Sequence, residues 1–215
     1  VVAEVLSFSE ALALVRLRAQ AMQDAVPEGI GGMAAILGLD EQTIQSICDE
    51  ISSLGNGDLL EPANFNSPGQ VVIAGHKNAI LRGIELAKSK GAKRAIMLPM
   101  SIPSHCSLMQ PAAETMQRQL AHLTLQAPKI PILHNVDVKT HSDAASIKQI
   151  LIQQLISPVR WVDTIQAFSV AGVTNIVECG PGKVLAGLNK RINSNLQQLP
   201  LADSEAIRQA VNSLS

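Results

Sequence analysis

Apolar side chains recur at helical spacing near the start of the chain. They predict a helix over residues 9–25, with Leu14, Val15 and Met22 on one face. Arg18 falls on that same face, three residues after Val15 and four after Leu14. A charge on the apolar side of a helix needs a partner, because removing an unpaired charge from water is costly. We therefore expect Arg18 to be engaged by a polar or charged group.

Between residues 32 and 101 short apolar runs alternate with helical stretches. The spacing predicts strands at 33–37, 62–66, 70–75 and 93–100, and helices at 41–52 and 77–90. The stretch 54–58, Leu-Gly-Asn-Gly-Asp, predicts a turn. The order strand-helix-strand-strand-helix-strand is that of a ferredoxin-like subdomain, which we place at residues 31–101.

The remaining residues, 1–30 and 102–215, also contain stretches with the apolar spacing of helices and stretches with that of strands. Pro111 fits only in the first turn of a helix, so one helix starts near residues 107–110. Further helices are predicted at 144–156, 161–171 and 184–193, and strands at 130–136 and 175–179. The fold class is therefore α/β, with the ferredoxin-like piece inserted into a larger α/β subdomain. Its early strands would precede Val1, so we expect that subdomain to be incomplete.

Composition narrows the possible functions. Of the 215 residues, 47% are hydrophobic and 16% charged, which is typical of a globular protein. The net charge is −1 and aromatic residues make up 2%, which argues against nucleic acid and anionic membranes as partners. No apolar run is long enough for a transmembrane helix. Three scattered cysteines without a CxxC pair argue against a structural metal and indicate a reduced, cytoplasmic protein.

His105 is the clearest chemical candidate. It lies in a Pro-Ser-His-Cys turn between a predicted strand and a predicted helix, where α/β sheets place functional groups. It could act as a general base, or it could be a surface or capping histidine. Cys106 adjoins it, but neighbours in a turn seldom face each other. The chain contains no G-x-S-x-G motif, so a nucleophile for His105 is not apparent.

Two glycine-containing turns also have alternative explanations. Residues 180–183, Gly-Pro-Gly-Lys, could cradle a phosphate at a helix N-terminus, but they lack P-loop spacing and a tight strand–helix turn is favoured. Residues 64–70 form a polar hairpin, which could be turn chemistry or a wall for an amide-rich ligand.

Six stretches in order resemble the bacterial malonyl-CoA:acyl-carrier-protein transacylase family. They are MQDAVPEG at 22–29, NFNSPGQVVIAG at 64–75, PSHC at 103–106, NVDV at 135–138, QLISPVRW at 154–161 and GPGKVL at 180–185. The resemblance extends over essentially the whole chain. It implies an α/β hydrolase-like acyltransferase domain with an inserted ferredoxin-like subdomain. The implied reaction moves malonyl from malonyl-CoA to the phosphopantetheine thiol of acyl carrier protein in fatty-acid biosynthesis, by ping-pong transfer through a malonyl-serine enzyme.

The resemblance also implies roles for individual residues. His105 matches the catalytic histidine, and Gln154 matches the residue whose main-chain carbonyl holds the other imidazole nitrogen. Arg18 matches the arginine that grips the malonyl carboxylate, a pairing that suits the guanidinium fork. Asn66 and Gln70 match positions that line the CoA or pantetheine arm.

The sequence departs from the family in one respect. The N-terminal third, with its serine elbow and part of the oxyanion hole, has no counterpart here, so we expect the chain as given not to turn over. The alternatives are a polyketide synthase acyltransferase domain or an inactive truncated binding fragment.

The implied partners are acyl carrier protein and malonyl-CoA, which is a substrate, so no cofactor or metal is expected. A monomer is expected for the complete protein. Basic side chains could steer the acidic carrier, either Lys190 and Arg191 or the group from Lys88 to Arg94.

Overall fold

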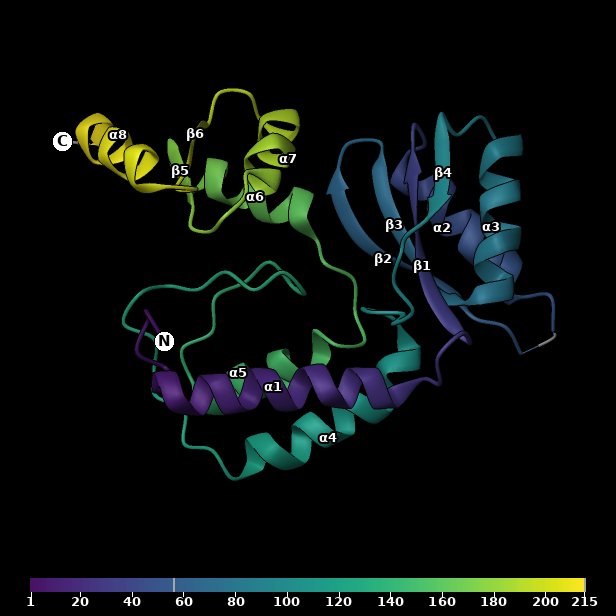
Figure 1. Ribbon diagram of the computed structural model, residues 1–215, viewed down its shortest axis with the longest axis horizontal. Helices are drawn as coiled ribbons and strands as arrows, with labels where there is room; N and C mark the ends of the chain where they lie inside the picture. The colour runs from purple at the N-terminus through teal and green to yellow at the C-terminus, as the bar shows by residue number, and fades with distance from the viewer. Residues whose placement is uncertain (56, 215) are drawn as a thin grey trace.

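Three helices of the larger part pack side by side. The computed structural model describes residues 1–55 and 57–214. Helix α1 (Phe8–Ala25) begins at a capping box, in which Ser7 and Glu10 satisfy each other's backbone amides. It packs against α4 (Gln110–Ala121) and lies near α5 (Ala144–Gln153), as Figure 1 shows. Their shared core consists of Leu14, Met22, Met109, Ala112, Ala113, Met116, Leu120 and Leu155.

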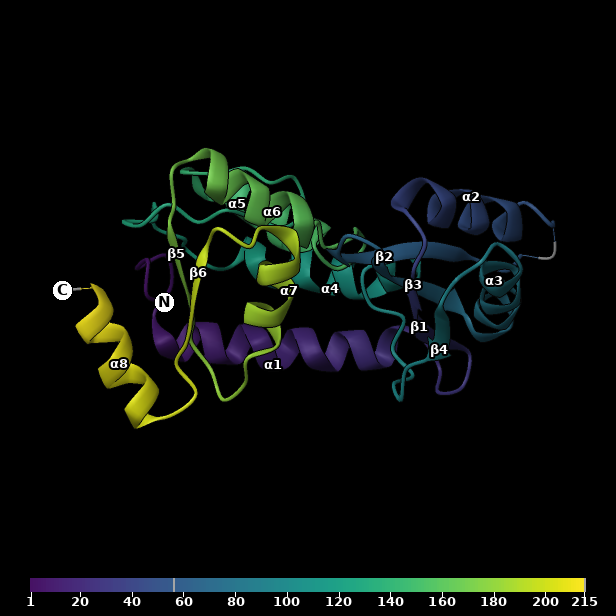
Figure 2. The same cartoon turned by 90° about the horizontal axis from the view of Figure 1, so that it is seen from above.

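A four-stranded sheet occupies the other end of the molecule (Figures 1 and 2). Its elements are β1 (Gly31–Leu37), α2 (Glu41–Ser52), β2 (Leu60–Ser67), β3 (Gln70–His76), α3 (Lys77–Ser89) and β4 (Arg94–Met97). The sheet order is β2-β3-β1-β4 and all neighbours are antiparallel. The strand-helix-strand-strand-helix-strand order is the one that the sequence predicts.

The two faces of this sheet bury different partners. Alternating side chains of β1 and β3, such as Ile36 and Ile73, pack with Ile44 and Ile80 of the covering helices. Burying each of these large side chains contributes roughly 1.5–3 kcal/mol. On the opposite face, the core consists of Met33, Ala63, Val72, Ala74 and Cys106. The sheet thereby rests directly against the loop that carries His105.

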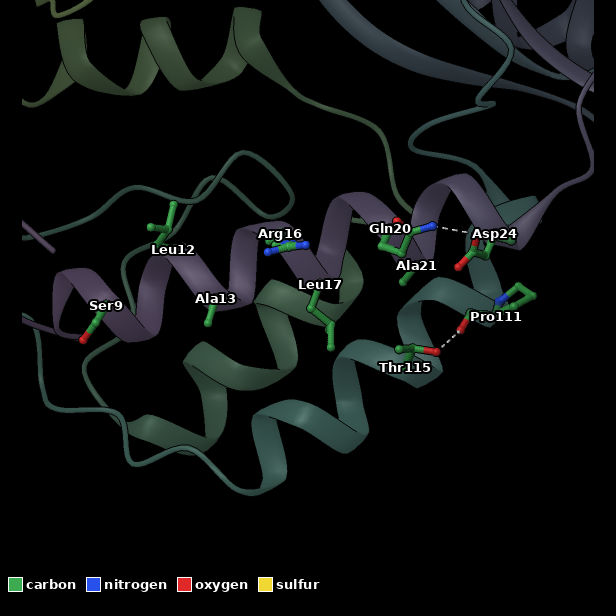
Figure 3. A pocket seen from close by; sticks show the side chains of 11 residues that line it. Ser9, Leu12, Ala13, Arg16, Leu17, Gln20, Ala21, Asp24, Pro111 and Thr115 are labelled. Carbon is green, nitrogen blue, oxygen red and sulfur yellow. Dashed lines mark hydrogen bonds between the residues drawn. The ribbon is translucent and has the colours of Figure 1, made fainter.

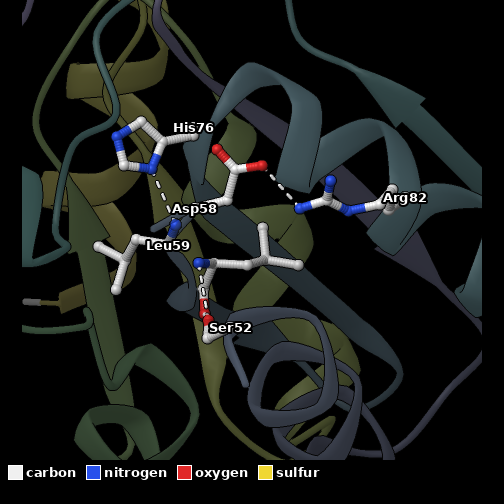
Figure 4. A network of polar contacts seen from close by, with 6 residues as sticks. Ser52, Asp58, Leu59, His76 and Arg82 are labelled. Atoms are coloured by element: carbon white, nitrogen blue, oxygen red, sulfur yellow. Dashed lines mark hydrogen bonds and ion pairs between the residues drawn. The ribbon is translucent and has the colours of Figure 1, made fainter. Parts of the chain in front are cut away.

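A network of polar contacts holds the connection between α2 and β2 in place (Figure 4). The Ser52 hydroxyl accepts from the Leu60 amide at 3.0 Å, and the Leu59 amide donates to His76 Nδ1 at 2.8 Å. Arg82 forms an ion pair with Asp58 at 2.7 Å. Asn56 of the turn predicted at 54–58 lies outside the described residues. The network anchors the start of β2, the strand that borders the functional site.

The C-terminal part adds α6 (Trp161–Val170), β5 (Asn175–Glu178), α7 (Val184–Ile192), β6 (Gln197–Pro200) and α8 (Ser204–Leu214). Strands β5 and β6 pair in parallel. Edge strand β2 joins this part to the four-stranded sheet, because Val159 donates to the Ala63 carbonyl and accepts from the Phe65 amide, both at 2.9 Å. None of the helices in residues 1–55 and 57–214 has the length and apolar character to cross a membrane.

The structure corrects several sequence expectations. Residues 130–136 form no strand. They make only an isolated bridge between Leu133 and Thr140, because the chain turns where Val138 donates to the His134 carbonyl. Val15 is 62% exposed, since the buried face of α1 runs through Leu14 and Met22. Strand β6 and helix α8 were not predicted, while an unpredicted 3-10 turn, η1 (Ser107–Met109), precedes α4.

Candidate active site

His105 and Gln154 meet although they are 49 residues apart in the chain. The distance from His105 Nδ1 to the Gln154 carbonyl oxygen is 2.8 Å. A carbonyl only accepts, so Nδ1 carries a proton, and in the neutral ring Nε2 then holds the lone pair. Gln154 is the C-cap residue of α5, and its amide is bonded back into that helix. The imidazole is thus fixed in the tautomer that leaves Nε2 as a base.

The environment of His105 favours the neutral ring. Burial lowers the pKa of His105, the hydrogen bond to Gln154 works in the opposite direction, and the charge of Arg18 lowers it further. A neutral imidazole is required if Nε2 is to accept a proton at neutral pH. The hydrogen bond of Nδ1 and the burial of the ring together favour the neutral tautomer in which Nε2 can accept a proton.

Arg18 contributes a second functional group at the same place. It projects from the middle of α1, it is half-buried, and burial lowers its pKa. The charge of Arg18 lowers the pKa of His105, so the guanidinium lies within electrostatic reach of the imidazole. In the described part of the chain Arg18 forms no ion pair with an acidic side chain. A half-buried guanidinium beside a base is suited to bind the carboxylate of a ligand.

Cys106 is excluded as the nucleophile that His105 would serve. Its side chain is fully buried, burial raises its pKa to about 12, and its thiol donates to the Pro103 carbonyl. A nucleophilic cysteine needs a thiolate, which this environment disfavours.

Gln70 and Asn66 lie away from this pair. Gln70 accepts from Arg191 Nη2 at 2.9 Å and lines a pocket of about 570 Å³ between the β2–β3 hairpin and the connection from β1 to α2, with Lys93 and Arg191 at its border. Asn66 is half-buried in β2. No hydrogen bond within the described residues joins either amide to His105, Gln154 or Arg18. The structure brings three of the five candidate residues together and places the other two farther along β2 and β3.

The Gly-Pro-Gly-Lys turn is a structural turn. The Glu178 carboxylate accepts from the amides of Leu185 at 3.1 Å and Ala186 at 2.8 Å, in the first turn of α7. These are the donors that a phosphate would need, so the phosphate-cradle interpretation is wrong.

A large pocket between α1 and α4 does not contain the candidate base. It is a groove of about 770 Å³, lined by Leu12, Leu17, Ala21, Pro111 and Thr115 among others (Figure 3). Its lining is mainly apolar, and neither His105 nor Gln154 takes part. Gln154 instead lines a smaller pocket of about 340 Å³ with His134 and His141. Chemistry, rather than size, locates the site. No set of three His, Cys, Asp or Glu side chains in residues 1–55 and 57–214 is arranged to hold a metal.

Comparison with known proteins agrees with this chemistry. Residues 1–202 match the acyl transferase domain family. The chain is 48% identical over 211 residues to the malonyl CoA-acyl carrier protein transacylase of Salmonella typhimurium, and 42% identical over 214 residues to that of Bacillus subtilis. These matches cover 98% and 100% of this chain, and 67% of each relative. The chain spans about two thirds of the length of the curated relatives it matches.

Solved structures give the same result. The transacylase of Coxiella burnetii has a TM-score of 0.95 at 47% identity, covering 99% of this chain and 66% of that one. The S-malonyltransferase of Burkholderia pseudomallei has a TM-score of 0.94 at 50% identity, covering 98% and 67%. The fold and the site define an acyltransferase. Within that class, the chain belongs to the malonyl CoA-acyl carrier protein transacylase family.

Proposed function

We propose that this chain forms the base and carboxylate-binding part of an enzyme that transfers malonyl from malonyl-CoA to the phosphopantetheine thiol of acyl carrier protein. The contact between His105 Nδ1 and the Gln154 carbonyl carries the proposal, because it orients a neutral imidazole without a buried carboxylate. The names of the relatives supply the acyl donor and the acceptor.

The reaction requires a nucleophile that His105 can deprotonate. In the proposed first half, His105 Nε2 takes the proton of a serine hydroxyl while the oxygen attacks the malonyl thioester. The imidazolium returns that proton to the CoA sulfur as the carbon–sulfur bond breaks. The second half reverses these steps with the carrier thiol. The chain has no G-x-S-x-G elbow, so the serine would lie outside these 215 residues, and we expect the chain alone to bind without turnover.

Arg18 would select the acyl group. A guanidinium can make two parallel hydrogen bonds to the free carboxylate of malonyl, and acetyl offers it no such partner. The proposal is supported by the electrostatic effect of Arg18 on His105 and by the lack of an acidic partner of Arg18 in the described part of the chain.

Asn66 and Gln70 would contact the pantetheine arm from the inserted sheet. Strand β2 runs from the His105 loop toward the hairpin, a length of roughly 25 Å at the usual rise per residue. We assign residues 31–101 to a ferredoxin-like subdomain, and 1–30 with 102–215 to the larger acyltransferase subdomain. The element order and the sheet order support this division.

Carrier docking would use basic side chains outside the catalytic pair. Lys190 and Arg191 lie in the last turn of α7. The group from Lys88 to Arg94 lies between the end of α3 and the start of β4. The proposed enzyme uses CoA as a substrate without a resident cofactor and works in the cytoplasm as a monomer. The three cysteines, all free, support a reducing compartment.

One comparison favours a second setting for the same chemistry. A solved complex of a type II polyketide acyl-carrier protein with its malonyl-transacylase matches at a TM-score of 0.95 and 44% identity. The acceptor could therefore be a polyketide carrier, with the same malonyl donor.

Intact-mass measurement tests the proposal. Incubation with malonyl-CoA should add one malonyl group to a protein in which a serine-bearing segment completes this chain, and His105→Ala should abolish the adduct. The 215-residue chain alone should gain none. An adduct that forms equally fast in His105→Ala would refute the role of His105 as base.

A further inference from the structure

Glu61 makes an unusual contact with the loop that carries His105. Its carboxylate accepts two hydrogen bonds from Ser107, one from the amide at 2.7 Å and one from the hydroxyl at 2.6 Å. Glu61 lies in β2 of the inserted sheet, 46 residues before Ser107. Ser107 follows His105 by two residues and begins the 3-10 turn that leads into α4. The contact therefore fixes the backbone immediately after the proposed base.

The His105 loop needs to be held from outside. His105 has φ 63°, in the left-handed region that residues with side chains seldom occupy. Such a conformation persists only where its surroundings enforce it. Within the loop, the Cys106 thiol donates to the Pro103 carbonyl. Among the described residues, Glu61 is the one side chain from another element that bonds to the backbone of residues 103–107.

The same strand also holds the segment that carries the partner of His105. Val159, five residues after Gln154, donates to the Ala63 carbonyl and accepts from the Phe65 amide. Strand β2 thus binds the His105 loop at Glu61 and the Gln154 segment at Ala63 and Phe65. The two atoms that must stay 2.8 Å apart are carried by segments that are both tied to this one strand.

We propose that Glu61 is a positioning residue for His105, which sets the loop so that Nδ1 meets the Gln154 carbonyl and Nε2 faces the reacting group. The proposal rests on the proposed function in one respect, the assignment of His105 as base. Glu61 acts through the backbone of Ser107 and does not touch the reacting atoms.

Asp40 provides a matched control. Its carboxylate also accepts from one amide and one hydroxyl, those of Thr43, at 2.7 Å and 3.1 Å. This contact is an ordinary N-cap at the start of α2, because Asp40 and Thr43 lie in the same helical turn. It does not involve the loop that carries His105. Removal of Asp40 should lose two comparable hydrogen bonds and destabilise α2, without displacing His105.

The experiment is NMR spectroscopy of the 215-residue chain, with the imidazole signals of His105 assigned by His105→Gln. In Glu61→Ala, the Nδ1 proton resonance should be lost to exchange with water, and the pKa of His105 should rise as burial is relieved. The Ser107 amide should exchange about tenfold faster or more, because hydrogen bonds to a charged acceptor are lost. Glu61→Gln should retain the wild-type His105 signals, since its amide can still accept from the Ser107 N–H and donate to the hydroxyl.

Asp40→Ala should leave the His105 signals in place. Unchanged His105 signals in Glu61→Ala would overturn the proposal, as would equal changes in Asp40→Ala. If Glu61→Ala does not fold, Ser107→Ala removes one of the two bonds, and the same signals decide in the same way. These signals do not depend on transferase activity, so the proposal can fail while malonyl binding through Arg18 stands, and the converse also holds.

Discussion

Arg18→Met should stabilise the ligand-free protein while it weakens binding of the malonyl group. Arg18 is half-buried on α1, and burial lowers its pKa. Methionine keeps most of the aliphatic stem and removes the guanidinium. The variant therefore separates the packing of the side chain from its charge.

The magnitude follows from the burial and the absence of an acidic partner in the described part of the chain. An unsatisfied buried charged group costs roughly 1–3 kcal/mol, and partial contact with water places Arg18 at the lower end. We expect Arg18→Met to raise the free energy of unfolding by about 1 kcal/mol. Two charge-assisted hydrogen bonds to malonyl contribute about 3 kcal/mol together. Their loss should weaken malonyl-CoA binding about 150-fold.

Urea unfolding and calorimetric titration measure the two effects. The fluorescence of Trp161, the single tryptophan, which is half-buried and bonded to Asn189, reports unfolding. Malonyl-CoA should bind far more weakly to Arg18→Met, and acetyl-CoA should bind equally to both proteins. Arg16→Met, on the exposed side of the same helix, should change neither quantity. A destabilised Arg18→Met, or an equal loss for both thioesters, would refute the reasoning.

Three further outcomes are expected. Burial lowers the pKa of His105 and of His134, so the folded protein binds fewer protons than the unfolded chain. Their contribution to stability is complete above the ordinary pKa of 6.5 and is lost as the pH falls through the lowered pKa values. Urea unfolding should therefore show a free energy of unfolding that decreases as the pH is lowered, and the decrease should be less steep in His134→Asn. Iodoacetamide should label Cys179 by mass spectrometry and spare Cys48 and Cys106, whose pKa values burial raises to about 12; labelling of all three would contradict the packing. Glu178→Ala should lower the free energy of unfolding by about 1–2 kcal/mol through loss of the α7 cap, and an unchanged melting temperature would exclude that role.

Local periodicity was sufficient for most elements. The apolar spacing of Ile44, Ile47 and Ile51 predicted α2 with the bounds that the structure has, because tertiary packing and local pattern agree there. The apolar run at 130–136 predicted a strand that the structure does not have. Pro131 has no backbone N–H to donate to a sheet, and the chain turns back at Val138. Helix α8 was not predicted from the sequence. It is amphipathic, but Ala210 is its one buried residue, so the helix contributes little to the core.

The site was accessible from the sequence only in part. His105 stood out by its place between a strand and a helix. The partner of His105 is a main-chain carbonyl, which every residue possesses, so only the family resemblance indicated Gln154. The Glu61–Ser107 contact spans 46 residues and has no motif, and no sequence signal could have found it without the fold. Long-range hydrogen bonds depend on topology, which local patterns do not encode.

The bonds made by β2 also limit how the molecule can move. Because one strand holds both the His105 loop and the Gln154 segment, a hinge motion of the four-stranded sheet against the rest of the chain would break these bonds and remove the support of the His105–Gln154 contact. We therefore expect the sheet and these segments to move as one rigid body. At the hairpin end, the sheet meets α7 through the exposed contact between Gln70 and Arg191. We then expect motion that admits a long ligand to be confined to that end, with the contact between His105 and the Gln154 carbonyl kept intact.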